Sequence, residues 1–278
     1  MAVCNSDCIA TQYASRWFKH LPPHDEYFRL QCAAIPPPDP VTVTDQQIPE
    51  NERLIFAMDV PDCDQAQHLA GELGDAVVFY KLGLELMMSG GYFELLDWML
   101  ERDKKVFADL KFYDIPATVG AAVRQLEHRG ASFVTVHGDQ SIMQAAADNK
   151  GDTLKVLVVT VLTSLDTSDL GDLGYACDVG ELVLARAKLA YETGCDGVIS
   201  SGLEAPKLRQ HVDPGLLVVT PGIRPAGNEP TADQKRVVTV SQALQNGADY
   251  IVVGRPIRDA DSPRAAAEAI QATIAAEF

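Results

Sequence analysis

Short apolar runs alternate with longer amphipathic segments along the chain from residue 53 onward. The apolar runs are rich in β-branched residues, which favour strands, and the segments between them are rich in Ala, Leu and Glu, which favour helices. The run 156–162 is almost uninterrupted in its apolar character, which is typical of a strand buried on both faces of a sheet. The expected strands are 54–58, 76–82, 105–111, 132–137, 155–162, 197–200, 216–220 and 250–254.

Eight strands that alternate with helices predict an α/β fold, a single closed (β/α)8 TIM barrel. The length of 278 residues and the hydrophobic content of 47% suffice for one large core. We therefore expect one barrel domain over 51–278, preceded by an N-terminal extension over 1–50. The extension contains a Pro-rich spacer at 35–40 and is expected to be partly disordered, with a short amphipathic helix over 11–21 as the alternative.

The charge balance restricts the classes of partner. Lys and Arg total 23 against 39 Asp and Glu, so the formal net charge of −16 repels nucleic acid and anionic membranes. No apolar run approaches the roughly 20 residues of a membrane helix. The six cysteines form no Cys-x-x-Cys pair and no zinc-type cluster with histidine, so we expect no metal site and a reducing, cytoplasmic location.

Polar residues stand at the carboxyl end of almost every expected strand, which is the end where (β/α)8 barrels place their active sites. A single Asp in such a position is usually a helix cap, and a single Lys is usually a solvated charge. The joint placement of these residues is therefore the stronger signal. They are Asp59, Lys81, Asp109, Lys111, His137, Thr163, Ser200, Arg224, Gly254 and Arg255. Among them, His137 has no second His or Cys partner in sequence and is interpreted as structural.

The segment 107–116 concentrates acids and bases. Asp109 and Lys111 are two apart on an expected strand, so their side chains should point to the same side. Asp114 precedes a helix that begins near Pro116, so we expect it on the turn and aimed differently. Lys81 on the preceding strand is expected to pair with Asp59 or Asp109 and to keep these groups charged.

Two segments indicate a grip for an anion. Arg224 follows a Pro-Gly turn after the seventh strand, and Gly254 and Arg255 follow the eighth. Barrels of this type often bind phosphate in that region. The intervening segment 225–235 is long enough to close over such a ligand. The alternative for Arg255 is a surface ion pair.

The segment 109–118, Asp-Leu-Lys-Phe-Tyr-Asp-Ile-Pro-Ala-Thr, resembles the Asp-x-Lys-x-x-Asp-Ile-Pro-x-Thr signature of the orotidine 5′-phosphate decarboxylase family. Further similar segments are 57–59, 80–83, 161–164, 221–224, 233–236 and 253–255. The resemblance covers about 53–276, and its order and spacing are similar to the short-loop, bacterial-type branch. It leaves 1–50 outside.

The resemblance implies cofactor-independent decarboxylation of orotidine 5′-monophosphate (OMP) to UMP and CO2, the final step of de novo pyrimidine biosynthesis. It implies that Lys111 protonates the C6 carbanion and that Asp109 lies beside the departing carboxylate. It further implies a homodimer in which Asp114 and Thr118 reach the neighbouring subunit's substrate. The substrate-binding set that it implies is Asp59 and Lys81 at the ribose, Thr163 at the pyrimidine, Gln234 between base and phosphate, and Arg224, Gly254 and Arg255 at the phosphate.

Two alternatives remain at this point. One is a Mg²⁺-dependent sugar-phosphate decarboxylase or aldolase of the same barrel family. Those relatives are expected to use a glutamate metal ligand at the second strand, where this chain has Lys81, and an ammonium group repels Mg²⁺. The other is a catalytically silent barrel that binds a nucleotide, against which the retention of the charged strand-end residues argues.

Overall fold

The computed structural model describes residues 48–224 and 236–278. Predictions for 1–47 and 225–235, including the disordered extension, the short helix over 11–21 and the closing segment with Gln234, lie outside the described residues. The chain divides into two units, 1–43 and 44–278, and the second contains the barrel. The boundary predicted at residue 50 stays a prediction.

Eight parallel strands close into a barrel in the order of the sequence, as predicted. Each strand pairs with its neighbours in the chain, and β8 pairs with β1 to complete the closure. The strands are β1 Leu54–Ala57, β2 Phe79–Leu82, β3 Lys105–Phe112, β4 Phe133–Val136, β5 Lys155–Val159, β6 Gly197–Ile199, β7 Leu217–Thr220 and β8 Tyr250–Val253.

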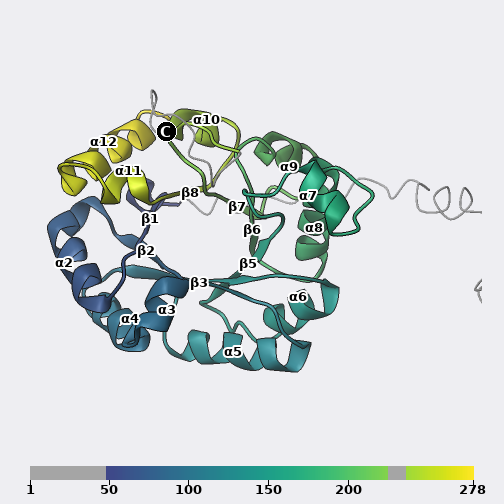
Figure 1. The fold of residues 1–278 in the computed structure, drawn as a ribbon, viewed down its shortest axis with the longest axis horizontal. Coiled ribbons are helices and arrows are strands. Elements are labelled where there is room, and N and C mark those ends of the chain that lie inside the picture. Colours follow the sequence, from purple (N-terminus) through teal and green to yellow (C-terminus); the bar gives the residue numbers. More distant parts are fainter. Residues whose placement is uncertain (1–47, 225–235) are drawn as a thin grey trace, which may run out of the picture. The chain divides into compact units, whose positions relative to one another are not determined.

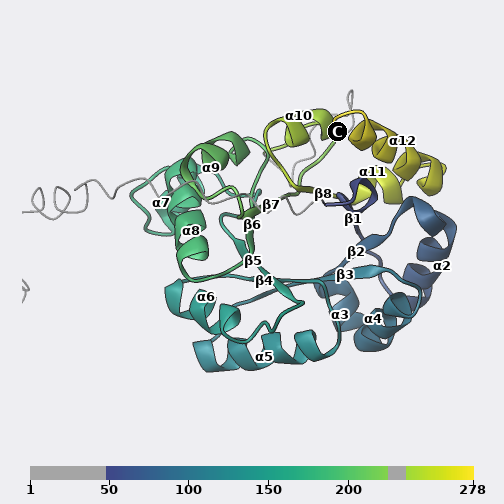
Figure 2. The ribbon, with the colours of Figure 1, turned by 180° about the vertical axis from the view of Figure 1, so that it is seen from behind.

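The helices form an outer ring around the strands in both ribbon views (Figures 1 and 2). Several begin where a polar side chain accepts a hydrogen bond from a free backbone N–H group of the first turn. These capping residues are Asp62, Asp139, Asp166, Asp178, Thr239 and Ser262. The helical elements are η1 Glu50–Glu52, α2 Cys63–Leu73, η2 Gly74–Ala76, α3 Leu84–Ser89, α4 Tyr92–Leu100, α5 Pro116–His128, α6 Gln140–Ala147, α7 Thr167–Asp172, α8 Val179–Glu192, α9 Ala205–His211, α10 Val240–Gln245, α11 Arg255–Arg258 and α12 Pro263–Ala275. None of the described helices is long and apolar enough to span a membrane.

The strands are buried on both faces because they separate two hydrophobic clusters. In β1, Leu54 and Phe56 pack outward against the helices, whereas Ile55 and Ala57 point into the barrel. Aromatic rings fill the interior, with the Phe79 and Phe133 centroids 4.9 Å apart. This packed interior lies directly below the polar residues at the carboxyl ends of the strands.

Most strands are one or two residues shorter than predicted, and two of them, β2 and β5, are three residues shorter. Ala76 belongs to η2 rather than to β2. The fifth strand ends at Val159, and both the backbone N–H and the hydroxyl of Thr160 donate to the carbonyl of Ile199, at 3.3 and 2.8 Å. The residues beyond β5 therefore form a loop at the rim of the barrel.

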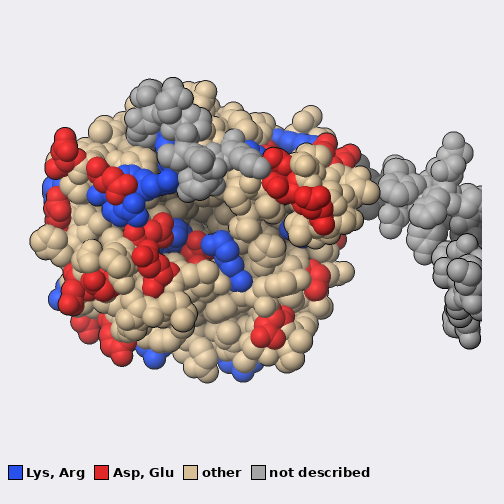
Figure 3. All heavy atoms as spheres, viewed as in Figure 1, with Lys and Arg blue, Asp and Glu red and all other residues tan. Residues whose placement is uncertain are grey.

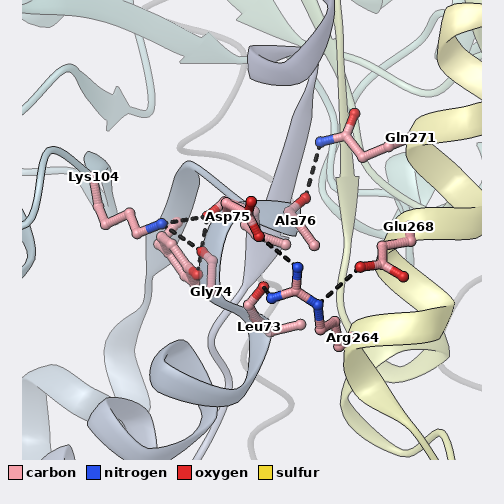
Figure 4. Close-up of polar contacts among 10 residues, drawn as sticks. Leu73, Gly74, Asp75, Ala76, Lys104, Arg264, Glu268 and Gln271 are labelled. Atoms are coloured by element: carbon pink, nitrogen blue, oxygen red, sulfur yellow. Dashed lines mark hydrogen bonds and ion pairs between the residues drawn. The ribbon is translucent and has the colours of Figure 1, made fainter.

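The last helix, α12, closes the ring against the turn between α2 and β2 (Figure 4). Arg264 of α12 contacts Asp75 of η2 at 2.5 Å and Glu268 of its own helix at 2.8 Å. Gln271 donates to the carbonyl of Ala76 at 3.1 Å. The two ends of the barrel sequence are thus joined by side-chain contacts as well as by the β1–β8 ladder.

Candidate active site

A cavity of about 440 Å³ opens at the carboxyl ends of the strands. On the face in Figure 3, acidic and basic side chains gather around the hollow at the centre of the barrel. The cavity combines charged groups with an apolar base. Eight of the predicted site residues line it: Asp59, Lys81, Asp109, Lys111, Thr163, Arg224, Gly254 and Arg255.

Four of these residues form a chain of alternating charge. The ammonium group of Lys81 lies 3.1 Å from Asp59 and 3.4 Å from Asp109. The ammonium group of Lys111 lies 2.8 Å from the other oxygen of Asp109. Lys81 therefore pairs with both carboxylates that were predicted as its alternatives. In the order Asp59, Lys81, Asp109, Lys111, these residues follow β1, β2 and β3 across the mouth of the barrel. The mouth is the end at which the cavity opens.

Burial and pairing act in opposite directions on this chain. Burial disfavours the charge of Lys81, but attraction by Asp109 and Asp59 outweighs it and raises the pKa of Lys81. Burial likewise disfavours the charge of Asp109, yet Lys81, Lys111 and a hydrogen bond from Thr135 hold its pKa below the usual range. Both groups therefore stay ionised at neutral pH. The side chain of Lys111 is 33% exposed, so it forms the open end of the chain.

The backbone beneath Lys111 departs from a regular strand. From Ala108 to Phe112, β3 advances by four positions, whereas β4 advances by only two, from Val134 to Val136, so β3 carries a bulge. Lys111 sits in this bulge with φ +49°, in the left-handed region that costs a non-glycine residue about 1–2 kcal/mol. Simple alternation correctly predicted that Asp109 and Lys111 share a side, but it did not predict this conformation. Residues with a strained backbone conformation of this kind are concentrated at functional sites.

Thr135 of β4 holds the bulge in place, although it was not predicted from the sequence as a site residue. Its hydroxyl oxygen accepts a 2.9 Å hydrogen bond from the backbone N–H of Lys111 and donates one of 2.9 Å to Asp109. The residue is fully buried. Thr135 lies inside an expected strand rather than at its end, so only the strand register could have pointed to it.

The opposite side of the mouth is cationic. Gly222, with φ +78°, makes the turn that brings the buried Arg224 to the cavity wall. Arg255 opens α11, and Arg258 follows one turn later on the same helix and also lines the cavity. Arg258 donates a 2.7 Å hydrogen bond to the carbonyl of Asp59. Arg258 was not predicted from the sequence, although its i+3 spacing from Arg255 was a usable signal.

The remaining predicted site residues lie elsewhere. Asp114 and Thr118 are exposed and do not line the cavity of their own chain. Asp114 lies on the turn before α5, as expected, and accepts a hydrogen bond from the N–H of Ile115. Gln234 lies outside the described residues. His137 is outside the cavity and packs edge-on against Tyr113 at 5.6 Å, in agreement with a structural role.

The cavity thus presents an ammonium–carboxylate pair at one side and guanidinium groups at the other. This arrangement suits an anionic ligand whose reacting group lies beside Lys111 and whose phosphate lies beside Arg224 and Arg255. Within the described residues, no group of three or more His, Cys, Asp or Glu side chains is arranged to hold a metal ion.

Comparison with known proteins gives consistent matches. Residues 52–270 match the family model described as "Orotidine 5'-phosphate decarboxylase / HUMPS family". The orotidine 5′-phosphate decarboxylase of Methylococcus capsulatus is 61% identical over 235 residues, which cover 84% of this chain and 97% of that protein. That of Xanthomonas oryzae pv. oryzae is 51% identical over 81% of this chain and 93% of its own. The crystal structure of the Lactobacillus acidophilus orotidine 5′-phosphate decarboxylase is similar with a TM-score of 0.72 and 36% identity, over 80% of this chain and 99% of that one.

Proposed function

The chain belongs to the orotidine 5′-phosphate decarboxylase / HUMPS family, and from that membership we infer that its mouth converts orotidine 5′-monophosphate to UMP and CO2 with Lys111 as the proton donor. The enzyme is a carboxy-lyase, and the reaction belongs to pyrimidine biosynthesis. The family match and the named relatives support this activity over a silent nucleotide-binding barrel.

The observation that carries the proposal is the alternating charge chain that ends at Lys111. Loss of CO2 breaks the bond between C6 and the carboxyl carbon and leaves the electron pair on C6. A fixed ammonium group interacts more strongly with this localised charge than with the delocalised carboxylate of the substrate, which lowers the barrier. Lys111 then transfers a proton to C6, and its exposed side allows the amine to regain a proton from water.

Asp109 has two roles in this scheme. Its carboxylate, 2.8 Å from the Lys111 ammonium, fixes the position of the proton donor. It also stands where the substrate carboxylate would lie, so repulsion between the two would be relieved as CO2 departs. We place the preorganised ammonium first among these effects, because a charge held in position needs no reorganisation during the reaction.

Lys81 supports this reaction over the metal-assisted reactions of the sugar-phosphate relatives. Its ammonium group lies between Asp59 and Asp109, at 3.1 and 3.4 Å, where it pairs with carboxylates that could otherwise bind Mg²⁺. Asp59 and Lys81 would contact the ribose hydroxyls. Thr163 would contact the pyrimidine, and Gln234 would join base and phosphate.

The guanidinium side of the mouth would bind the phosphate. Arg224, Gly254 and Arg255 line the cavity together, and the phosphate that they hold would supply binding energy remote from the reacting carbon. We therefore expect Arg255→Ala to lower kcat/KM for OMP. An unchanged kcat/KM would remove Arg255 from the site.

A homodimer is also part of the proposal. Asp114 and Thr118 are exposed, and the neighbouring Tyr113 and Ile115 expose 70% and 67% of their surface, which suits contact with a second subunit. If Asp114 serves the partner's site, mixing inactive Asp114→Ala and Lys111→Ala chains should restore about a quarter of the wild-type activity, because half of the random dimers carry one intact site. No recovery after mixing would place Asp114 outside the partner's site.

A cytoplasmic location stays a prediction.

Turnover of OMP, followed as loss of its ultraviolet absorbance with and without EDTA, tests the function. Activity that EDTA does not affect and that Lys111→Ala abolishes is the expected result. Activity only on a sugar phosphate with Mg²⁺, or UMP binding without turnover, would overturn the proposal.

A further inference from the structure

Arg236 joins three loops at the rim of the mouth, although it does not line the cavity. Its guanidinium contacts the carboxylate of Glu204, in the loop between β6 and α9, at 2.6 Å. The same guanidinium donates to the carbonyls of Leu162 at 3.0 Å and Val161 at 3.3 Å, in the loop that follows β5. One side chain thus connects the loops after β5 and β6 to the segment that precedes α10.

That segment is in turn joined to the turn after β7. Ile223 and Val238 form a short parallel bridge, in which the N–H of Arg224 donates to the carbonyl of Val238 at 3.0 Å. Gly202 of the β6 loop lies so close that a Cβ atom there would meet Val238 at 2.6 Å. The position of Arg236 is therefore coupled to Arg224 on one side and, through Leu162, to Thr163 on the other.

The ion pair is buried and depends on both partners. The side chains of Arg236 and Glu204 are each 12% exposed. Within the described residues, the Arg236 Nε and the second oxygen of Glu204 are buried without a hydrogen-bond partner. Loss of either partner would leave a buried charge uncompensated, so the pair holds its three loops in one arrangement.

We propose that Arg236, held by Glu204, is a positioning residue that sets the distance between Thr163 and Arg224, and hence the base-to-phosphate length that the mouth accepts. This inference rests on the proposed function, since it assumes that a nucleotide spans these two residues. Arg236 acts through the loops and does not touch the nucleotide.

A matched pair at the opposite end of the barrel provides the control. Arg209 contacts Asp249 at 2.5 Å and also donates to backbone carbonyls, among them those of Gly247 and Leu216, each at 2.8 Å. The chemistry is the same, but none of these residues lines the cavity. Arg209→Met should therefore lower the melting temperature and leave nucleotide binding unchanged.

The test compares Arg236→Met, Arg236→Lys and Arg209→Met in the full-length chain. We expect Arg236→Met to raise KM for OMP and to weaken competitive inhibition by UMP about tenfold, because a small displacement of positioning groups has large effects. Inhibition by uridine, which lacks the phosphate, should weaken less than inhibition by UMP. Arg236→Lys, which keeps the charge but not the forked donor, should lie between wild type and Arg236→Met.

An unchanged KM in Arg236→Met, or an equal rise of KM in Arg209→Met, would overturn the inference. If Arg236→Met fails to fold, Glu204→Gln gives the same comparison, with a smaller expected rise of KM and an unchanged KM as the contrary result. Failure of the proposed function is distinguishable, because a wild-type chain that binds UMP without decarboxylating OMP still allows the UMP and uridine measurements to decide the role of Arg236.

Discussion

The two ends of the barrel use the same residue types in different ways. At the amino ends of the strands, Asp249 accepts a hydrogen bond from the N–H of Val218 at 2.7 Å and pairs with Arg209. Asp196 similarly accepts from Val156 at 2.8 Å and pairs with Lys150. At the carboxyl ends, the charged groups bond mainly to one another and to Thr135.

This difference indicates what each set of charges does. The carboxylates at the amino ends complete the backbone hydrogen bonds of β5 and β7, so they contribute to the fold. At the mouth, Lys81 and Asp109 hold each other ionised, and Lys111 lines the cavity beside them. Buried charges at one end therefore affect folding, and those at the other end affect the reaction.

The largest expected effect is the loss of turnover in Lys111→Gly. Removal of the fixed ammonium group should lower kcat for OMP by at least about 10³-fold, the upper range for one preorganised electrostatic group. The matched change at the amino end, Lys150→Gly, should keep its turnover. Equal losses in the two variants would contradict the division between the ends.

The same position offers a second measurement. Lys111 has φ +49°, a conformation that is strained for alanine but not for glycine. In urea unfolding, the free energy of unfolding of Lys111→Gly should therefore be about 1 kcal/mol higher than that of Lys111→Ala. A higher stability of the alanine variant would mean that the bulge relaxes when the side chain is removed.

The next largest effect is expected from Asp249→Ala. It leaves the half-buried Arg209 without its partner and removes the acceptor of the Val218 N–H, so the free energy of unfolding should fall by about 3 kcal/mol. Because the mouth is distant, kcat/KM measured on the folded protein should stay within about twofold of wild type. A large fall in kcat/KM would show that the two ends are coupled.

Thr135→Val should have a smaller effect on catalysis. The change keeps the shape but removes the hydrogen bonds to Asp109 and to the N–H of Lys111, so kcat should fall about 10- to 100-fold through misplacement of the proton donor. Thr135→Ser keeps the hydroxyl and should retain most of the activity. An equal loss of kcat in Thr135→Val and Thr135→Ser would assign the effect to packing instead.

The smallest effect concerns pH. Burial, with Arg186 and Lys111 nearby, lowers the pKa of His137, so its contribution to stability is present above about pH 6.5 and is lost as the pH falls towards the folded-state pKa. We expect less than about 1 kcal/mol, because the half-exposed ring is screened by solvent. Urea unfolding at pH 8 and pH 5 should show this loss in wild type but not in His137→Gln.

The charged residues at the mouth change their contribution to stability outside the range of pH 5 to 8. The contribution of Asp109, whose pKa is lowered, is present above the unfolded value of about 3.9 and is lost as the pH falls through the folded-state pKa. The contribution of Lys81, whose pKa is raised, is present below about 10.4 and is lost as the pH rises through the folded-state pKa. A midpoint between pH 5 and 8 that disappears in Lys81→Met would contradict both directions.

Much of the architecture could be predicted from the sequence because apolar runs and strand ends are local properties. Asp59, Lys81, Asp109 and Lys111 each follow or end a recognisable strand, so the barrel topology alone brings them together. Errors at the strand ends, such as Ala76, arose where a short helical turn interrupts an apolar run.

The rest depends on register and on distant partners. The bulge at Lys111 and the hydroxyl of Thr135 follow from how β3 aligns with β4, which no spacing within one strand reveals. Glu204 and Arg236 lie 32 positions apart in loops, and each resembles an ordinary surface charge in sequence. Tertiary packing alone makes them a buried pair.

The closure of the barrel by β8 and α12 also has a consequence for synthesis of the chain. Leu54–Ala57 emerges from the ribosome long before Tyr250–Val253, the strand with which one of its edges pairs. Until then β1 exposes an unpaired edge, the kind of surface through which nascent chains associate. The contacts of Arg264 and Gln271 with residues 75 and 76 form later still. Completion of the sheet must therefore wait until Tyr250–Val253 has been translated.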